Sequence, residues 1–287
     1  MRKKIAVVRK VSDVGTSEPW SARMWFGILQ IRDHALKAGG RRGHPECEEK
    51  SRAFDKIYRP LLDNLGDAYK TLTNLEKLII QHEKDLLDNK VLRIDENQHS
   101  IEHPIDQEVK ILFRAFVNSL ATALKQTQHV CKFIDESFDL GFLFATNDIN
   151  FSKKVSTIEK QNGDFFGLLP MIKSFRPLSN EIIVFNRNPI EHPNDGFVLP
   201  DIEYDFEQKK ISSDFYSQKK LQCYWENTWR FCEIMVVNAF ALKIKYPWGI
   251  VEIPQKERDP DMPIKYKPWI IDDKIFGKIQ EHIANSK

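Results

Sequence analysis

The stretch IDQEVKILFRAFVNSLATALKQTQHVCKFIDESF, residues 105–138, carries the strongest secondary-structure signal in this sequence. Asp106 stands near its start, where the positive end of a helix dipole favours a carboxylate. Apolar residues recur at the spacing that places them on one side of an α-helix; they are Val109, Leu112, Phe113, Phe116, Val117, Leu120, Leu124, Val130, Phe133 and Ile134. A helix this long must bury that side against other helices, so the stretch predicts an all-α fold.

Helical spacing continues on both sides of this stretch. Apolar residues are spaced for helices over 20–37, 61–87 and 218–246. Pro60 is expected to break the helix that starts near Glu46, because proline removes a backbone donor. The 218–246 segment is apolar around more than one side, which is typical of a helix buried in a core or in an oligomer interface.

The segments between these helices give weaker signals. Residues 87–104 are polar and predict a loop, and residues 139–163 show no clear period. A helix is expected over 163–175, ended by Pro177, and a short one over 272–285.

A further helix is expected to run towards His192, with Ser179 or Asn180 as the residue that caps its start. The turn-forming residues 193–196 follow it. Residues 197–206 then alternate apolar and polar, as an edge strand does.

These elements predict an antiparallel helical bundle with a small extended element after residue 196. We expect three parts, an N-terminal helical extension (1–104), the bundle (105–246) and a C-terminal extension packed on the same domain (247–287). The sequence contains no internal repeat, low-complexity tract or flexible linker.

The composition is that of an ordinary globular protein, with 41% hydrophobic and 29% charged residues. Its 43 basic and 41 acidic residues give a net charge of +2, so any contact with nucleic acid must use a local patch. The apolar run near the N-terminus is too short for a signal peptide, and no stretch is long enough to span a bilayer. We therefore expect a soluble cytoplasmic protein that does not associate with a membrane.

Four cysteines are spread along the chain, namely Cys47, Cys131, Cys223 and Cys232. Without an export signal, free buried thiols are the expectation. His44 with Cys47, and His99 with His103, have ligand-like spacing, but the segment between the two pairs is too long for a compact zinc site. We therefore predict no bound metal and no cofactor.

The segment Arg187-Asn188-Pro189-Ile190-Glu191-His192 carries the candidate chemistry. No glycine-rich phosphate loop, G-x-S-x-G elbow, H-E-x-x-H motif or Ca²⁺ loop occurs in the sequence. An arginine can hold two phosphate oxygens as negative charge develops on them. A histidine titrates near neutral pH and can pass a proton to or from a ribose oxygen. Arginine and histidine together therefore suit phosphodiester cleavage.

The five-residue spacing bears on how such a site is assembled. Five residues of an ideal α-helix turn through about 140°, so Arg187 and His192 do not share one side of it, whereas Asn188 and His192 do. Two subunits that meet along this segment can pool their arginines and histidines. This geometry favours a homodimer with a composite site.

The pattern Arg187-Asn188-x-Ile190-x-His192 in a helical chain resembles the signature of the HEPN superfamily. The resemblance covers roughly residues 105–246. It implies a bundle of four or five helices, dimerisation along the motif helix and metal-independent endoribonuclease activity on RNA. Carried over, Arg187 and His192 are catalytic and Asn188 is the supporting polar residue. The resemblance also makes the chain a toxin or defence candidate and leaves a cognate inhibitor protein open as a partner.

Alternatives exist for the same residues. Asn188 as a cap, Pro189 at the first helical position and Glu191 near the third describe an ordinary helix start. If these residues only start a helix, the chain is a non-catalytic helical module of the HEPN type that binds nucleotide, RNA or a regulatory protein. A purely structural dimer is the third interpretation. The loose pattern also recurs at Arg93 and His99, within the predicted loop.

The aromatic helix that includes Tyr224 and Trp225 could stack on nucleic-acid bases. A core helix or a dimer seam is the better interpretation, because Arg230 is the one basic residue interleaved with these aromatics.

Overall fold

The structure is a computed structural model of the 287-residue chain. It describes residues 19–29, 32, 45–95, 98–136, 138–145, 147–161, 169–187, 199, 201–213, 217–243, 248–252, 256 and 266–270.

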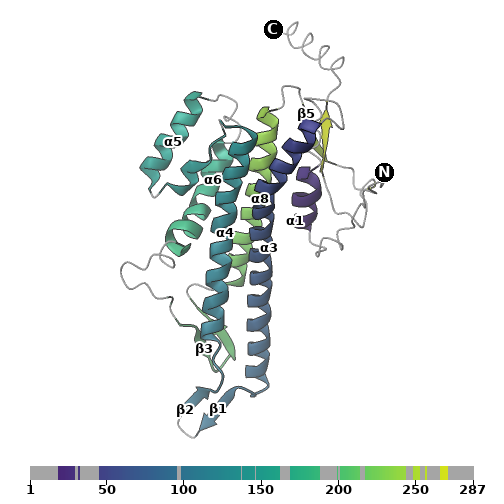
Figure 1. Cartoon of the computed structure of the whole chain (residues 1–287). Helices are drawn as coiled ribbons and strands as arrows, with labels where there is room; N and C mark the ends of the chain where they lie inside the picture. The colour runs from purple at the N-terminus through teal and green to yellow at the C-terminus, as the bar shows by residue number, and fades with distance from the viewer. Residues whose placement is uncertain are drawn as a thin grey trace, which may run out of the picture. The chain divides into compact units, whose positions relative to one another are not determined.

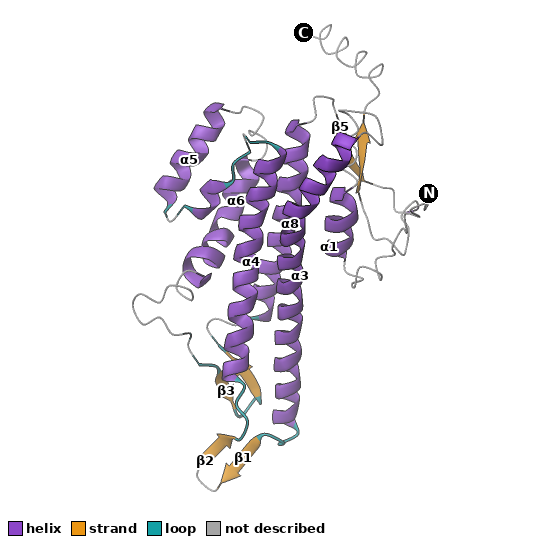
Figure 2. Cartoon of the chain, in the orientation of Figure 1, coloured by secondary structure: helices purple, strands orange, loops and turns teal. Residues whose placement is uncertain are grey.

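Helices make up most of the described chain, which confirms the predicted all-α class (Figure 1 and Figure 2). The helical segments are α1 (Pro19–Ala22), η2 (Arg23–Gly27), α3 (Pro45–Leu87), α4 (Asp106–Ile134), η3 (Gly141–Phe144), α5 (Asp148–Gln161), α6 (Leu169–Asn180), η5 (Glu181–Arg187) and α8 (Gln218–Lys243). Within the described ranges the strands form three antiparallel pairs, namely β1 (Leu92–Asp95) with β2 (Gln98–Ile101), β3 (Glu203–Asp205) with β4 (Lys210–Ser212), and β5 (Trp248–Glu252) with β6 (Tyr266–Ile270).

Contacts between residues divide the chain into two compact units. Unit 1 contains residues 1–62, 127–140 and 232–287, and unit 2 contains residues 63–126 and 141–231. Each of α3, α4 and α8 therefore contributes one part to each unit. The three-part organisation expected from the sequence stays a prediction.

Unit 1 is held together by aromatic packing. The ring of Phe54 on α3 stacks on Tyr58 at 5.0 Å and lies 5.4 Å from the ring of Phe240 on α8. The hydroxyl of Tyr58 donates a hydrogen bond of 2.6 Å to the buried carbonyl oxygen of Met24. Burial raises the pKa of Tyr58 well above its ordinary value, with a smaller contribution from the charge of Glu233. This hydroxyl therefore ties η2 to α3 as a neutral donor.

Two cysteines lie in the same core. Cys131 and Cys232 are buried and free, as expected from the sequence, whereas the free Cys223 is exposed. Burial raises the pKa of the Cys131 thiol and raises that of Cys232 to about 12. Both thiols are therefore neutral packing groups.

Unit 2 packs α8 against α3 and α6. The ring of Tyr69 lies 5.4 Å from Trp225, and Phe175 stacks on Phe231 at 3.9 Å. Trp229 of the same helix is also buried. The aromatic residues of α8 are thus buried inside the chain, as a core helix requires.

Pro60 does not break α3, contrary to the sequence prediction. The two residues that follow it, Leu61 and Leu62, are both buried. Burial of the apolar side of a long helix offsets the backbone hydrogen bond that a single proline removes.

The polar segment expected to be a loop contains the β1–β2 hairpin, which connects α3 to α4 (Figure 1). The helix before it ends in a Schellman arrangement without glycine: Lys90 N–H donates to the Asp85 carbonyl at 2.8 Å and Asn89 N–H to the Leu86 carbonyl at 3.1 Å. Asn89 has a φ of 55°, which asparagine tolerates better than most residues.

Helix α5 was not predicted, because the residues it buries, Phe151 and Val155, leave a weak hydrophobic period. The Asn147 side-chain oxygen accepts a hydrogen bond of 2.8 Å from Asn150 N–H and so caps the helix start. The short helix expected over 272–285 lies outside the described residues. Among the described helices, none combines the length and apolarity required to cross a membrane.

The Tyr58 hydrogen bond gives a test of this packing. Tyr58→Phe should lower the free energy of unfolding by about 1–3 kcal/mol, because it leaves a buried carbonyl without its donor. Thr157→Val is the matched control, since the exposed Thr157 hydroxyl donates to the Lys153 carbonyl and water can replace it. The control should change stability by less than about 0.5 kcal/mol in urea denaturation. Equal losses in the two variants would contradict this account.

Candidate functional site

The arginine of the motif lies at the end of an irregular helix in unit 2. Helix α6 continues past Pro177 and is followed directly by the π-helical segment η5, whose last residue is Arg187. The predicted helix start at Ser179 or Asn180 is therefore wrong. The Ser179 hydroxyl is buried and donates to the Arg176 carbonyl at 3.0 Å, so it does not cap a new helix. Single-turn π-helical segments often occur at functional sites.

The segment η5 is fixed from both its apolar and its polar sides. Ile182 and Ile183 are buried. The Glu181 carboxylate forms an ion pair with Lys220 on α8. Partial burial acts to raise the pKa of Glu181, but hydrogen bonds from Lys220 and Tyr224 and the charge of Lys220 lower it overall. Glu181 therefore stays ionised and holds the start of η5 against α8.

A second arginine nearby has a structural role. Arg176 on α6 is buried and donates to the carbonyls of Leu143 at 3.2 Å and Ala145 at 2.7 Å. Its guanidinium lies 4.8 Å from the ring centre of Phe151, and its Nε lies 3.5 Å from the Asp148 carboxylate. Burial lowers the pKa of Arg176, although Asp148 acts to raise it. This guanidinium connects α6, η3 and α5 and is committed to the fold.

Arg187 itself is half-buried, and the residue takes part in at least one interaction within the protein. Asn188 and His192 lie outside the described residues, as do the turn at 193–196 and the cap proposed in the alternative interpretation. The structure therefore places one of the three predicted site residues. Its π-helical setting also means that the ideal α-helix assumed from the sequence does not hold for residues 181–187.

The next described residues after Arg187 are attached to unit 2. Leu199 is buried, and the Asp201 carboxylate forms an ion pair with Lys110 of α4. The next N–H, that of Ile202, donates to the Asp106 carboxylate at 3.1 Å. Residues Asp201 and Ile202 are thus attached to α4 of unit 2.

The β3–β4 hairpin completes this attachment. The Tyr204 hydroxyl accepts a hydrogen bond of 3.2 Å from Ile105 N–H. Glu83 of α3 accepts one of 3.2 Å from Ile211 N–H. Lys209 donates to the side chain of Asn89 at 2.8 Å. The hairpin therefore links the end of α3 to the start of α4.

One titratable group is buried beneath the hairpin. The ring of His82 is 5% exposed and makes an edge contact with the Tyr204 ring at 5.8 Å between centroids. Its Nε2 has no hydrogen-bond partner in the described structure. Burial lowers the pKa of His82, and the charges of Asp85 and Asp106 offset only part of this effect. His82 is therefore neutral at pH 7.

Burial also raises the pKa of Tyr204, and the nearby Asp106 carboxylate adds to the increase. The cluster of Tyr204, Asp106 and His82 thus contains one charge, on the carboxylate. The Tyr204 hydroxyl and the Asp106 carboxylate accept hydrogen bonds from backbone N–H groups and so attach the hairpin to α4. None of the three side chains in this cluster is an activated nucleophile.

The second loose match to the motif does not form a pair. Arg93 is opposite Ser100 and Ile94 is opposite His99 in the β1–β2 hairpin. Arg93 and His99 are therefore not partners across the hairpin. The described residues contain no group of three or more potential metal ligands.

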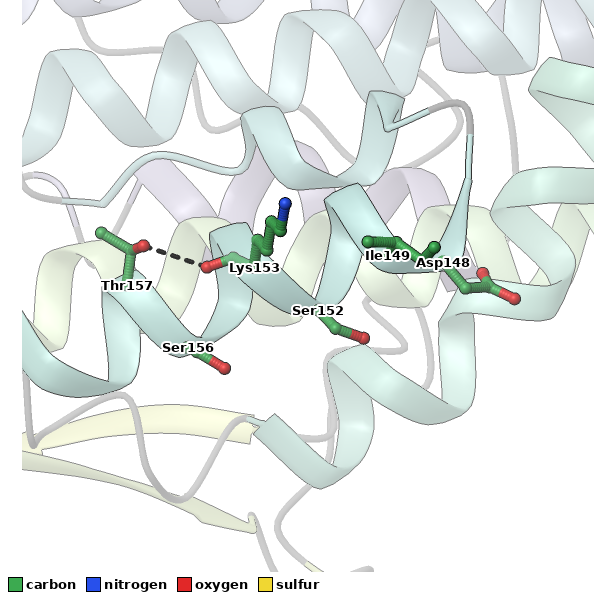
Figure 3. A pocket seen from close by; sticks show the side chains of 6 residues that line it. All are labelled: Asp148, Ile149, Ser152, Lys153, Ser156 and Thr157. Carbon is green, nitrogen blue, oxygen red and sulfur yellow. Dashed lines mark hydrogen bonds between the residues drawn. The ribbon is translucent and has the colours of Figure 1, made fainter.

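An open groove of about 770 Å³ follows one side of α5 (Figure 3). Its described lining residues all belong to that helix and are Asp148, Ile149, Ser152, Lys153, Ser156 and Thr157. In Figure 3 the Lys153 ammonium and the Ser156 hydroxyl leave the helix on different sides. Among its described lining residues there is no histidine, the side chain that most often activates a hydroxyl.

We compared the chain with protein families, curated proteins and solved structures. No protein-family model matches the chain, and searches of curated proteins and of solved structures also return no match. The resemblance to HEPN domains therefore depends on the motif and on the helical character of the chain.

The buried His82 predicts a dependence of stability on pH. Its pKa in the folded protein is lowered, so the unfolded chain binds the proton more tightly. The free energy of unfolding should therefore fall as the pH drops below about 6.5, with a slope of at most about 1.4 kcal/mol per pH unit. His82→Gln should reduce this slope in urea denaturation between pH 5 and 7.

His129→Gln is the control, because it removes an exposed imidazole from α4. It should keep the pH dependence of the parent protein. A His82→Gln protein with the slope of the parent would show that His82 does not carry the effect.

Proposed function

We propose that the chain is a metal-independent endoribonuclease of the HEPN type, with its site on Arg187, Asn188 and His192. The observation that carries this proposal is the motif, an arginine followed directly by asparagine and, five residues after the arginine, by histidine. Its setting agrees with the proposal, since the chain is mainly helical and Arg187 ends a helical segment.

The chemistry follows from the two ionisable side chains. His192 accepts the proton of a ribose 2′-OH as its oxygen attacks the neighbouring phosphorus. The bond from phosphorus to the 5′ oxygen of the next nucleotide then breaks, and that oxygen takes up a proton from an imidazolium. Arg187 stabilises the charge on the phosphorane oxygens, and Asn188 positions the reacting groups. The products are a 2′,3′-cyclic phosphate and a 5′-hydroxyl, and no metal ion takes part.

We further propose that the site is composite and lies at the interface of a homodimer. Two copies of the motif supply two arginines and two histidines, so one histidine can accept the proton while the other donates one. The aromatic residues of α8 lend no support to this interface, because they are buried within one chain. The proposal for a dimer depends on the motif alone.

The alternative is a non-catalytic module that uses the same surface to bind nucleotide, RNA or a regulatory protein. The partial burial of Arg187 favours this alternative, because a half-covered side chain presents less of its guanidinium to a reacting phosphate.

The cleavage mechanism makes a direct prediction. His192→Ala should lower the rate of RNA cleavage by about 10²–10⁴-fold, because general acid–base help is lost. Arg187→Lys should also be severely impaired, because an ammonium lacks the planar fork of donors. Asn188→Ala should lose less. The measurement is cleavage of a labelled RNA, followed with and without EDTA, and circular dichroism of each variant.

The double variant Arg93→Ala/His99→Ala is the control, since its two residues are not paired with each other in the β1–β2 hairpin. It should cleave like the parent protein. Normal cleavage by His192→Ala, or its unfolding, would favour the interpretation of this segment as an ordinary helix start. Loss of activity in EDTA would contradict the metal-free mechanism.

The composite site predicts a concentration-dependent assembly. The full chain should sediment as a homodimer at tens of micromolar protein. Mixing His192→Ala with Arg187→Lys chains should restore part of the cleavage that each variant lacks, because one interface then contains an intact histidine and an intact arginine. A monomer in sedimentation would contradict the composite site.

A further inference from the structure

A buried histidine lies at the contact between α3 and the β3–β4 hairpin of unit 2. His82 of α3 is 5% exposed, and its ring makes an edge contact with the ring of Tyr204 on β3. The hairpin itself lies beside the last turns of α3 and the start of α4 (Figure 1). The hairpin therefore helps to keep water away from the His82 imidazole.

The hydrogen bonding of this imidazole makes the contact sensitive to protonation. Within the described part of the chain, the buried Nε2 atom of His82 has no hydrogen-bond partner. A neutral imidazole can leave one ring nitrogen as an unused acceptor, whereas an imidazolium has an N–H donor on both nitrogens. A buried donor without an acceptor costs free energy. The contact with the hairpin therefore accepts the neutral ring and disfavours the protonated one.

The carboxylates near His82 already accept hydrogen bonds from other groups. The side-chain amide of Gln81 donates to both carboxylate oxygens of Asp85 on α3, each at 3.1 Å. The carboxylate of Asp106 on α4 accepts the Ile202 N–H at 3.1 Å. The charges of Asp85 and Asp106 offset only part of the effect of burial, so the pKa of His82 is lowered overall. Neither carboxylate forms a hydrogen bond with Nε2.

The hairpin is attached to the helices mainly by bonds that water can replace. Tyr204 accepts the Ile105 N–H and Glu83 accepts the Ile211 N–H, both at 3.2 Å and both only partly buried. Among the strand residues of β3 and β4, Ile211 alone is buried. Segments with few buried apolar contacts open locally at a lower free energy than packed helices do. The hairpin can therefore separate from α3 and α4 without unfolding them.

We propose that His82 is a pH switch: protonation of its ring releases the β3–β4 hairpin from the ends of α3 and α4 while these helices stay packed. Once the hairpin has moved away, water solvates the imidazolium, so the open form binds the proton more tightly than the closed form. The closed form is therefore favoured at neutral pH and loses ground as the pH falls below about 6.5, the ordinary pKa of histidine. The switch does not depend on the proposed ribonuclease function.

Hydrogen exchange of the full chain, measured by mass spectrometry, separates release of the hairpin from global unfolding. The amides compared are those of the hairpin segment (residues 201–213) and of α4 (residues 109–124). Release of the hairpin exposes little surface, so its amides should exchange faster than those of α4 and should hardly respond to urea below the unfolding transition. The amides of α4 should exchange through unfolding and should respond to urea.

The protection of the hairpin amides is then compared at pH 7.5 and pH 5.5, after correction for the slower chemical exchange of amides in acid. It should fall by about two- to tenfold at the lower pH, because a histidine with an ordinary pKa of about 6.5 changes from mostly neutral to mostly protonated over this range.

Substitutions of His82 should remove this change. His82→Phe keeps a ring against Tyr204 but cannot bind a proton, and His82→Gln is the second variant in case the larger ring disturbs the packing. Tyr204→Phe should lower the protection at both pH values and retain the change between them, because it removes the acceptor of the Ile105 N–H but not the imidazole. The control His129→Gln removes an exposed imidazole and should behave like the parent.

Three results would overturn the proposal. The first is a hairpin whose amides share the protection and the urea response of α4, since opening would then be global. The second is hairpin protection that does not fall between pH 7.5 and pH 5.5. The third is a fall that both His82 variants retain, provided that circular dichroism shows the helix content of the parent.

Discussion

The constraint on which the rest of unit 2 depends is the burial of one side of each long amphipathic helix. The apolar side of α3 packs through Leu72, Leu75 and Ile79, and α4 buries Phe113 and Phe116. Helices of this kind gain most of their stability from such packing rather than from intrinsic propensity. This explains why α3 continues through Pro60. It also explains why the polar face of α3, with its lysines, has a fixed orientation towards solvent.

Packing of helix sides leaves the helix ends to be satisfied by other means. The last turn of α3 uses Asn89 in a left-handed conformation, and Asp106 at the start of α4 accepts the Ile202 N–H. The β3–β4 hairpin joins these two ends through Tyr204 and Glu83. The hairpin therefore supplies a hydrogen-bond acceptor to a backbone N–H group that the start of α4 would otherwise leave unsatisfied. As a consequence, the chain is held against the start of α4 at Ile202 and against the last turns of α3 at Ile211.

The sequence predicted the elements whose signal is local and periodic. The stretch 105–138 corresponds to α4, whose apolar residues are spaced along one side, and the stretch 218–246 corresponds to α8, which is apolar around more than one side. It did not predict the β1–β2 hairpin, whose strands are four residues long, or α5, which buries few residues. The π-helical form of η5 was also missed, because no residue pattern distinguishes it from the end of an α-helix. Pro177 was given too much weight, since a proline near the end of a packed helix is tolerated.

In the candidate site, too, the sequence predicted what is local and missed what depends on distant parts of the chain. Arg187 was identified because its motif is contiguous in sequence. The roles of Arg176 and His82 could not be predicted from the sequence, because they depend on residues that lie far away along the chain. Arg176 contacts carbonyls more than thirty residues before it, and His82 meets a tyrosine from β3. Burial decides the role of each polar group here, and burial is a property of the whole fold.

The proposed function imposes one further requirement, which concerns electrostatics. A chain with a net charge of +2 has no general attraction for RNA, so a ribonuclease of this composition needs its positive charge in one place. The motif contributes one arginine, and Arg176 is committed to the fold. The proposed homodimer meets this requirement in part, because the second copy of the motif contributes a second arginine at the same interface.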